Sequence, residues 1–331
     1  MKRLLTIFAT TAAVVAVFGA PAAGHGREQT YAITQTTPAG PTPHFPGYDA
    51  ASGNVLVSNP SAGTVTELVL GAGPTRSFAA GAVPHTVVVD SRSRRAFVTN
   101  KGAASVSVLD LDTGATASFA VGPNPHGLAI DNARNRLYVT SIDADQLEVY
   151  DLQTLELVAT VPVGDGPWGV TVEAGRIAVT DTAGSTVHLI DATTLKVRDV
   201  VEVGQGPWNA RFAGSTLFVT LERAGEVVAV RHGQIIWRTQ VGASPHGIVV
   251  DQRRGPVLAA VTGTNNVVVL DSRTGDITQT IGMPAGPAGM TIDPDTGRVW
   301  VDSHLTPTGT QLPWFNWQAL GNAKQRSRGA R

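Results

Sequence analysis

Six aromatic side chains recur at one place in the sequence, directly after a proline, and could bind a ligand. They are His44, His85, His126, Trp168, Trp208 and His246. Neutral imidazoles bind transition metals, protonated imidazoles bind anions, and flat indoles stack on sugars or planar rings. The same side chains could instead bond to the backbone of a connecting loop. The residue types therefore indicate either a ligand site or a structural lock.

A second set of polar residues ends the segment that follows each aromatic residue. Asn59, Asn100 and Ser141 lie 15 residues after His44, His85 and His126, and Ser303 lies 15 residues after Ala288. We expect two antiparallel strands to bring the two sets to the same side. The predicted ligand site thus adds Asn59, Asn100, Ser141, Asp181, Ser303 and the adjacent His304.

Several residues could serve metal binding or acid–base chemistry. His85, His126 and His246 are candidate ligands for a divalent metal, although histidines on separate repeats can stand too far apart for bonds of ~2 Å to one ion. Cleavage after Ala22 would place His25 third in the chain, where it could help hold Cu(II) in a square plane. Of the carboxylates, Asp181, Asp302 and Glu222 come nearest to the expected site, and we interpret them as solvated loop residues. The chain has no cysteine.

The prolines that precede the six aromatic residues belong to a repeat that runs along most of the chain. Its seven copies start at intervals of 38 to 42 residues, at Pro43, Pro84, Pro125, Pro167, Pro207, Pro245 and Pro287. A period near 40 with strand signals throughout is typical of a β-propeller. In the third copy we predict strands at 127–131, 136–140, 146–151 and 157–163, counted from the channel outward. The sequence therefore predicts an all-β, seven-bladed propeller with four-stranded blades.

The seventh copy is incomplete, because its pattern ends near Ser303. We expect an N-terminal strand at Tyr31–Thr34 to become the outermost strand of the last blade and to close the ring. Leu312–Trp317 is the candidate for the third strand of that blade. The domain prediction is a propeller over 30–318, followed by a basic, disordered tail over 319–331.

The first 22 residues have the features of a secretory signal. Lys2 and Arg3 precede an apolar run, and Ala20 and Ala22 are the small residues expected before a cleavage site. We therefore predict a secreted or extracytoplasmic monomer without a transmembrane segment. The formal net charge of −1 gives no electrostatic argument for nucleic acid.

The second strand of each copy carries a recurring motif, as in RRAFVTN at 94–100 and RLYVTS at 136–141. With the preceding PHG and apolar-Asp elements, it resembles the YVTN-type β-propeller repeat family over about residues 30 to 303. That resemblance implies an exported, seven-bladed protein and leaves its activity open. The chain more distantly resembles streptogramin lyases, which use a histidine, glutamates and magnesium, but it lacks the corresponding glutamates.

Three hypotheses for function follow. The first is a binding protein without catalysis that takes a small molecule, glycan or protein at a channel mouth lined by His and Trp. The second is a lyase-like or lactonase-like enzyme that needs a divalent metal. The third is an inert scaffold of the cell envelope.

Overall fold

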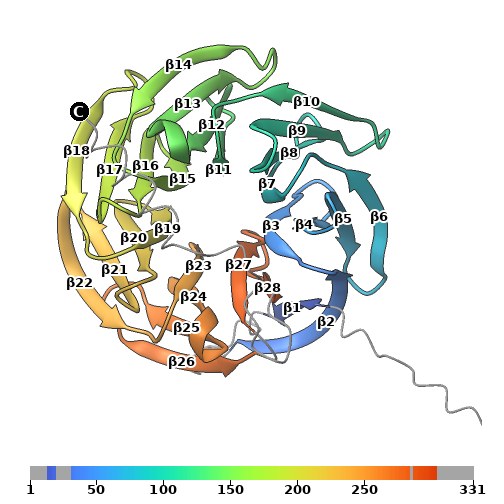
Figure 1. Ribbon diagram of the computed structural model, residues 1–331. Coiled ribbons are helices and arrows are strands. Elements are labelled where there is room, and N and C mark those ends of the chain that lie inside the picture. The colour runs from blue at the N-terminus through green and yellow to red at the C-terminus, as the bar shows by residue number, and fades with distance from the viewer. Residues whose placement is uncertain (1–12, 20–30, 284–285, 304–331) are drawn as a thin grey trace, which may run out of the picture.

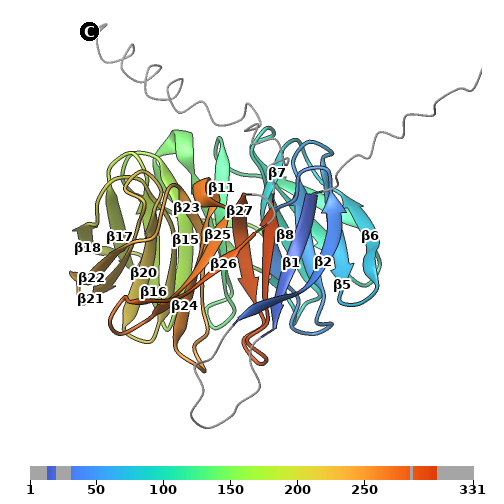
Figure 2. The ribbon, with the colours of Figure 1, turned by 90° about the horizontal axis from the view of Figure 1, so that it is seen from below.

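The computed structural model describes residues 13–19, 31–283 and 286–303. Their strands form seven four-stranded antiparallel sheets. Figure 1 shows the sheets set radially around a central axis, and Figure 2 shows the same ring from the side, with the inner strands running along that axis. The chain is an all-β propeller whose blades are four-stranded antiparallel sheets.

The blade that starts at Pro125 shows how the repeat folds. From the axis outward it consists of β11 (Pro125–Asp131), β12 (Arg136–Ser141), β13 (Gln146–Asp151) and β14 (Leu157–Pro162). The carboxylate of Asp131 accepts hydrogen bonds from the backbone N–H groups of Ala133 and Arg134 in the first turn. Asn135 ends this turn with a φ of 53°, a conformation that asparagine tolerates better than most residues. The four predicted strands of this copy are confirmed, with shifts of at most two residues at their ends.

The other blades repeat this order. Around Pro43 and Pro84 they contain β3 (His44–Tyr48), β4 (Val55–Asn59), β5 (Thr64–Val69), β6 (Gly73–Ala79), β7 (Pro84–Asp90), β8 (Arg95–Asn100), β9 (Ser105–Asp110) and β10 (Thr116–Ala120). The next two contain β15 (Pro167–Glu173), β16 (Arg176–Asp181), β17 (Thr186–Asp191), β18 (Val197–Glu202), β19 (Pro207–Ala213), β20 (Thr216–Leu221), β21 (Glu226–Arg231) and β22 (Gln234–Gln240). The last strands are β23 (Pro245–Val250), β24 (Pro256–Val261), β25 (Asn266–Asp271), β26 (Ile277–Gly282), β27 (Pro287–Ile292) and β28 (Val299–Ser303).

The hydrophobic core lies between neighbouring blades. One cluster joins Phe97 of β8 to Leu128, Leu137 and Val139 of the next blade, all of them buried. Burying a side chain of this size contributes about 1.5–3 kcal/mol. The inner strands contact one another in the cyclic order β3, β7, β11, β15, β19, β23, β27 and back to β3. Packing between blades therefore positions the seven inner strands around the axis.

The sheet that joins the chain ends has the strand order β2, β1, β28, β27. Its outermost strand is β2 (Ala32–Gly40), which agrees with the predicted N-terminal strand at Tyr31–Thr34 but is longer. The third position belongs to β1 (Ala13–Gly19), in which Val15 pairs with Asp302 and Val17 with Trp300. In the full chain β1 thus holds the place for which Leu312–Trp317 is the sequence candidate.

The sequence AVVAVFG explains why β1 can take this place. It is rich in β-branched and aromatic residues, which favour strands, although the same apolar run also suggested a signal peptide. The signal over 1–22 stays a prediction, and Leu312–Trp317 and the 319–331 tail lie outside the described residues. Within the described part of the chain, no helix has the length and apolar character needed to cross a membrane.

Candidate functional site

The six repeated aromatic residues meet at the channel. Their rings form a continuous series of contacts in which neighbouring centroids are 3.8 to 4.4 Å apart, in the order His44, His85, His126, Trp168, Trp208, His246. Phe45 joins this series, with its ring centroid 5.1 Å from that of His85. We call these seven side chains the aromatic plug. Each is at most 9% exposed, so they fill the channel instead of lining an open mouth.

This difference from the expected open mouth has a geometric cause. The aromatic residues stand at or next to the first residue of their inner strands, where the blades lie closest to the axis. Rings as large as imidazole and indole meet across that space and bury one another's faces. The repeat period predicts that the six residues occupy equivalent positions, but the radius of the channel cannot be inferred from it.

Hydrogen bonds determine which nitrogen of His126 carries the proton. Its Nδ1 donates to the carbonyl oxygen of Trp168 at 3.2 Å, while its Nε2 has no hydrogen-bond partner among the described residues. Burial lowers the pKa of His126 well below its usual 6.5, and the charges of Lys101 and His44 lower it further. His126 is therefore a neutral imidazole at pH 7, with a lone pair on Nε2.

Two other plug histidines contact each other directly. The Nε2 atoms of His44 and His85 are 2.8 Å apart, so one donates a proton and the other accepts it. His246 places Nδ1 3.0 Å from the hydroxyl of Thr262, which itself donates to the carbonyl oxygen of Pro287. His246 must then donate from Nδ1, because the single hydroxyl proton is already used.

Hydroxyl groups behind the plug hold its backbone. Thr140 donates to the carbonyl oxygen of Trp168 in the next blade and accepts the N–H of Gly127 in its own blade. The same donation to the plug residue of the next blade comes from Ser58, Thr99, Thr180 and Thr220. These residues are the next-to-last of each second strand, which gives the Thr of the VTN and VTS motifs a structural role.

The second predicted set does not join the plug. The amide of Asn100 accepts the N–H of Gly81 and donates to Ser105 and Ser107. Asn59 donates to the carbonyl oxygen of Ala39 and to Thr66. Asn100 thus bonds to the link before its blade and to the third strand, whereas Asn59 bonds to strand β2 and to the third strand.

Strand geometry explains this outcome. Ser141 pairs with Pro125, one residue before the His126 that the 15-residue spacing indicated. Successive side chains of a strand point to opposite faces, so Thr140 reaches the plug region while Ser141 does not. Ser141, Asp181 and Ser303 are buried at equivalent places, whereas His304 and His25 lie outside the described residues.

The structure also shows where the candidate carboxylates and the candidate metal ligands lie. The interpretation of Asp181 and Asp302 as solvated loop residues is wrong, because both lie buried in strands. Asp181 accepts bonds from Gly184 and Thr186, Asp302 accepts the N–H of Gly289, and burial raises the pKa of Asp181 and of Glu222. The rings of His85 and His126 are adjacent, but Trp168 and Trp208 lie between them and His246 in the series of ring contacts. Among residues 13–19, 31–283 and 286–303, no three His, Asp or Glu side chains are placed to hold a metal ion.

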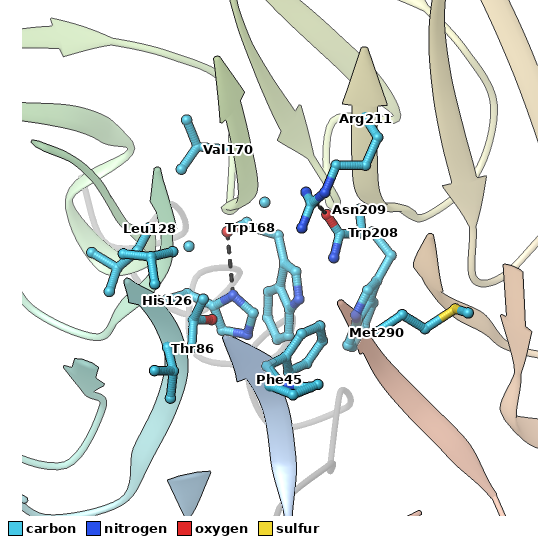
Figure 3. Close-up of a pocket in the computed structure, with 15 residues that line it drawn as sticks. Phe45, Thr86, His126, Leu128, Trp168, Val170, Trp208, Asn209, Arg211 and Met290 are labelled. Carbon is cyan, nitrogen blue, oxygen red and sulfur yellow. Dashed lines mark hydrogen bonds between the residues drawn. The ribbon is translucent and has the colours of Figure 1, made fainter. Parts of the chain in front are cut away.

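A cavity of about 50 Å³ lies against the plug (Figure 3). Its walls include four plug members, Phe45, His126, Trp168 and Trp208, and two polar residues of β19, Asn209 and Arg211. One water needs about 10–15 Å³ of such space, so the cavity can hold several waters or a ligand of a few atoms.

Arg211 is the charged residue of this cavity. Its Nη1 donates to Oδ1 of Asn209 at 3.0 Å and to the carbonyl oxygen of Ala210 at 2.8 Å. Burial lowers its pKa to about 10, so the guanidinium is still charged at neutral pH. No carboxylate of the described residues forms an ion pair with it.

Lys101 is a second cationic group beside the plug. Its Nζ lies 4.9 Å from the ring centroid of Trp168, within the range of a cation–π interaction. Burial lowers the pKa of Lys101 to about 8, and the charge of Asp143 opposes that shift. The plug is thus flanked by two cationic side chains.

Asn209 and Arg211 are not among the predicted site residues, although their position in the repeat carries a signal. Where β19 has Arg211, the other inner strands have Gly47, Val88, Ala129, Thr171, Val249 and Thr291, all uncharged. Where β19 has Asn209, four of them have glycine. A comparison of the copies at these positions would have shown that β19 differs from the rest.

Comparisons with known proteins support the fold and leave the family open. No family model and no curated protein matches the chain. Among solved structures, hydrazine synthase of Kuenenia stuttgartiensis is similar, with a TM-score of 0.72 and 18% sequence identity. The match covers 86% of this chain and 96% of that chain. At this identity the likeness shows a shared propeller fold.

Proposed function

We propose that this chain is an exported binding protein without catalysis, which holds a small molecule in the channel beside the aromatic plug. The observation that carries the proposal is the cavity bounded by His126, Trp168, Trp208 and Arg211. Ligand pockets combine apolar walls with a few fixed polar groups, and this cavity has both. Export is part of the proposal, on the basis of the signal-like sequence at 1–22, as is membership of the seven-bladed YVTN-type repeats.

The geometry favours a small molecule over a glycan or a protein. Sugars stack on exposed indole faces, but Trp168 and Trp208 are 4% and 1% exposed. A cavity of about 50 Å³ is also far below the roughly 300–1,000 Å³ that drug-sized ligands occupy. The residues that line it include no carboxylate for acid–base work. These features support binding over the lyase-like or lactonase-like alternative, and the polar wall distinguishes the channel from that of an inert scaffold.

A cavity-filling substitution tests the proposal. Val88 lines the cavity, so Val88→Phe should block it, whereas Val158→Phe adds the same ring volume on the exposed strand β14. Ligand-observed NMR with a library of acids, amides, alcohols and amines of up to six heavy atoms would measure binding. We expect at least one compound to bind the wild-type protein and the Val158→Phe variant but not the Val88→Phe variant. The proposal fails if no compound binds, or if all three proteins bind alike.

A further inference from the structure

We infer that the channel cavity binds a small planar oxyanion of the carboxylate type, with Arg211 as its anchor. The inference rests on the proposed function and names the ligand class for that cavity. It comes from the charge balance of the site, from the donors that remain available there, and from the shape and size of the space.

Arg211 is partly buried and has no countercharge in the described part of the chain. A buried cation is costly unless it is paired or hydrogen-bonded. The neighbours Asn209 and Ala210 supply neutral oxygen atoms, and the described residues supply no carboxylate. The facing walls include the rings of Trp168 and Trp208, whose apolar surface strengthens electrostatic interactions inside the cavity. An anion in this space would provide the missing countercharge.

The unused donors of Arg211 match such an anion. A guanidinium has five N–H donors, and the bonds to Asn209 and Ala210 both come from Nη1. The donors on Nε and Nη2 have no partner among the described residues. A planar oxyanion accepts two parallel bonds from this kind of fork, which is why arginine recognises carboxylates so well.

Asn209 adds a donor of fixed direction. Its Oδ1 accepts hydrogen bonds from the N–H of Ala210 at 2.9 Å and from Arg211 at 3.0 Å. This arrangement fixes the amide and leaves Nδ2 as a donor that no residue of the described chain uses. Arg211 and Asn209 together present donors, which suits a negatively charged ligand.

Size limits the ligand to a few heavy atoms. Acetate is a suitable probe of this size. Acetamide is its neutral control, because it has nearly the same shape and lacks the charge. Calorimetric titrations at constant ionic strength, with chloride as the balancing anion, would compare the two. We expect the wild-type protein to bind acetate at least about tenfold more tightly than acetamide.

Variants connect binding to Arg211. Arg211→Met removes the charge and should abolish acetate binding. Asn209→Asp places a carboxylate beside the guanidinium, so it should also abolish acetate binding while keeping the cation paired and the fold intact. Arg176→Met is the matched control, because the guanidinium of Arg176 lies over the ring of Phe212, outside the residues that line the cavity. It should bind acetate like wild type.

Three outcomes separate this inference from the proposed function. Selective acetate binding that disappears in Asn209→Asp and persists in Arg176→Met supports the inference. Binding of neutral library compounds that Val88→Phe abolishes, without selective acetate binding, overturns the inference and leaves the proposed function standing. Absence of binding by both acids and neutral compounds overturns both.

Discussion

The hydroxyl of Thr140 lies 2.8 Å from the carbonyl oxygen of Trp168 and donates a hydrogen bond to it across the boundary between two blades. The hydroxyl oxygen of Thr140 also accepts a hydrogen bond from the N–H of Gly127, at 2.7 Å. One side-chain atom therefore links two inner strands and fixes the backbone of a plug residue. Thr99 and Thr180 make the same pair of bonds in their blades.

Replacing Thr140 by valine should lower the free energy of unfolding by about 1–3 kcal/mol. Valine keeps the shape of threonine but removes the hydroxyl, so the buried N–H of Gly127 loses its partner. Chemical denaturation at pH 7 would measure the change. Thr116→Val on the exposed strand β10 is the control and should change stability by less than about 0.5 kcal/mol. Equal effects of the two substitutions would contradict this role of the hydroxyl.

Gly127→Ala should also destabilise the protein, by about 1–3 kcal/mol, because there is no room for a methyl group. A Cβ at this position would lie 2.6 Å from the carbonyl oxygen of Trp168 and 3.0 Å from the backbone nitrogen of Val170. A Cβ on Gly282 would meet no atom within 4 Å, so Gly282→Ala should be tolerated. Thermal unfolding of the two variants checks the contrast. If the Gly127→Ala protein were as stable as the Gly282→Ala protein, the blades could move apart to admit the methyl group without loss of stability, which would contradict this prediction.

Stability should fall as the pH drops below about 6.5, in part because of His126. Its pKa is lowered in the folded protein, mainly by burial, so in this window the unfolded chain binds a proton that the folded chain does not. The contribution can reach about 1.4 kcal/mol per pH unit. His126→Phe keeps an aromatic ring without the titration. Urea unfolding between pH 7.5 and 5 should therefore show the variant gaining stability relative to wild type as the pH falls. A pH-independent difference would refute this assignment.

A protein that begins at Ala23 lacks β1 and should expose the backbone of β28. In the full chain, β1 pairs with β28 from Val299 to Asp302. Hydrogen exchange followed by mass spectrometry should show faster exchange in 299–303 after truncation, because an edge strand has unpaired amides. Strand β24 of the neighbouring blade, at 256–261, should keep its protection. Unchanged protection of 299–303 would mean that another segment replaces β1.

Much of the fold could be predicted from local sequence. The repeat proline opens each inner strand from Pro84 to Pro287, and the turn residues between Asp131 and Arg136 fix where β11 ends and β12 begins. These signals depend on local backbone preferences, which a single copy of the repeat already contains. The position of β1 could not be found in this way, because its pairing with β28 joins residues nearly 300 positions apart.

The candidate site was harder to predict because it depends on distances across the axis. The shared position of His126, Trp168 and Trp208 indicated that they would meet, but their mutual burial depends on the channel radius. Ser141 was misplaced because the spacing gives the register of the backbone and not the face to which the side chain points. Arg211 could not be assigned to the site in this way, because it is a single charge in a largely apolar strand and has no equivalent in the other blades.

One sheet combines strands from both ends of the chain, and this constrains when the protein can finish folding. Strands β1 and β2 come from the first 40 residues, whereas β27 and β28 end at Ser303, so the four cannot pair until almost the whole chain has left the ribosome. Pairing over such separations is slow, and β2 remains without its sheet throughout synthesis. Ring closure is then a late, post-translational step.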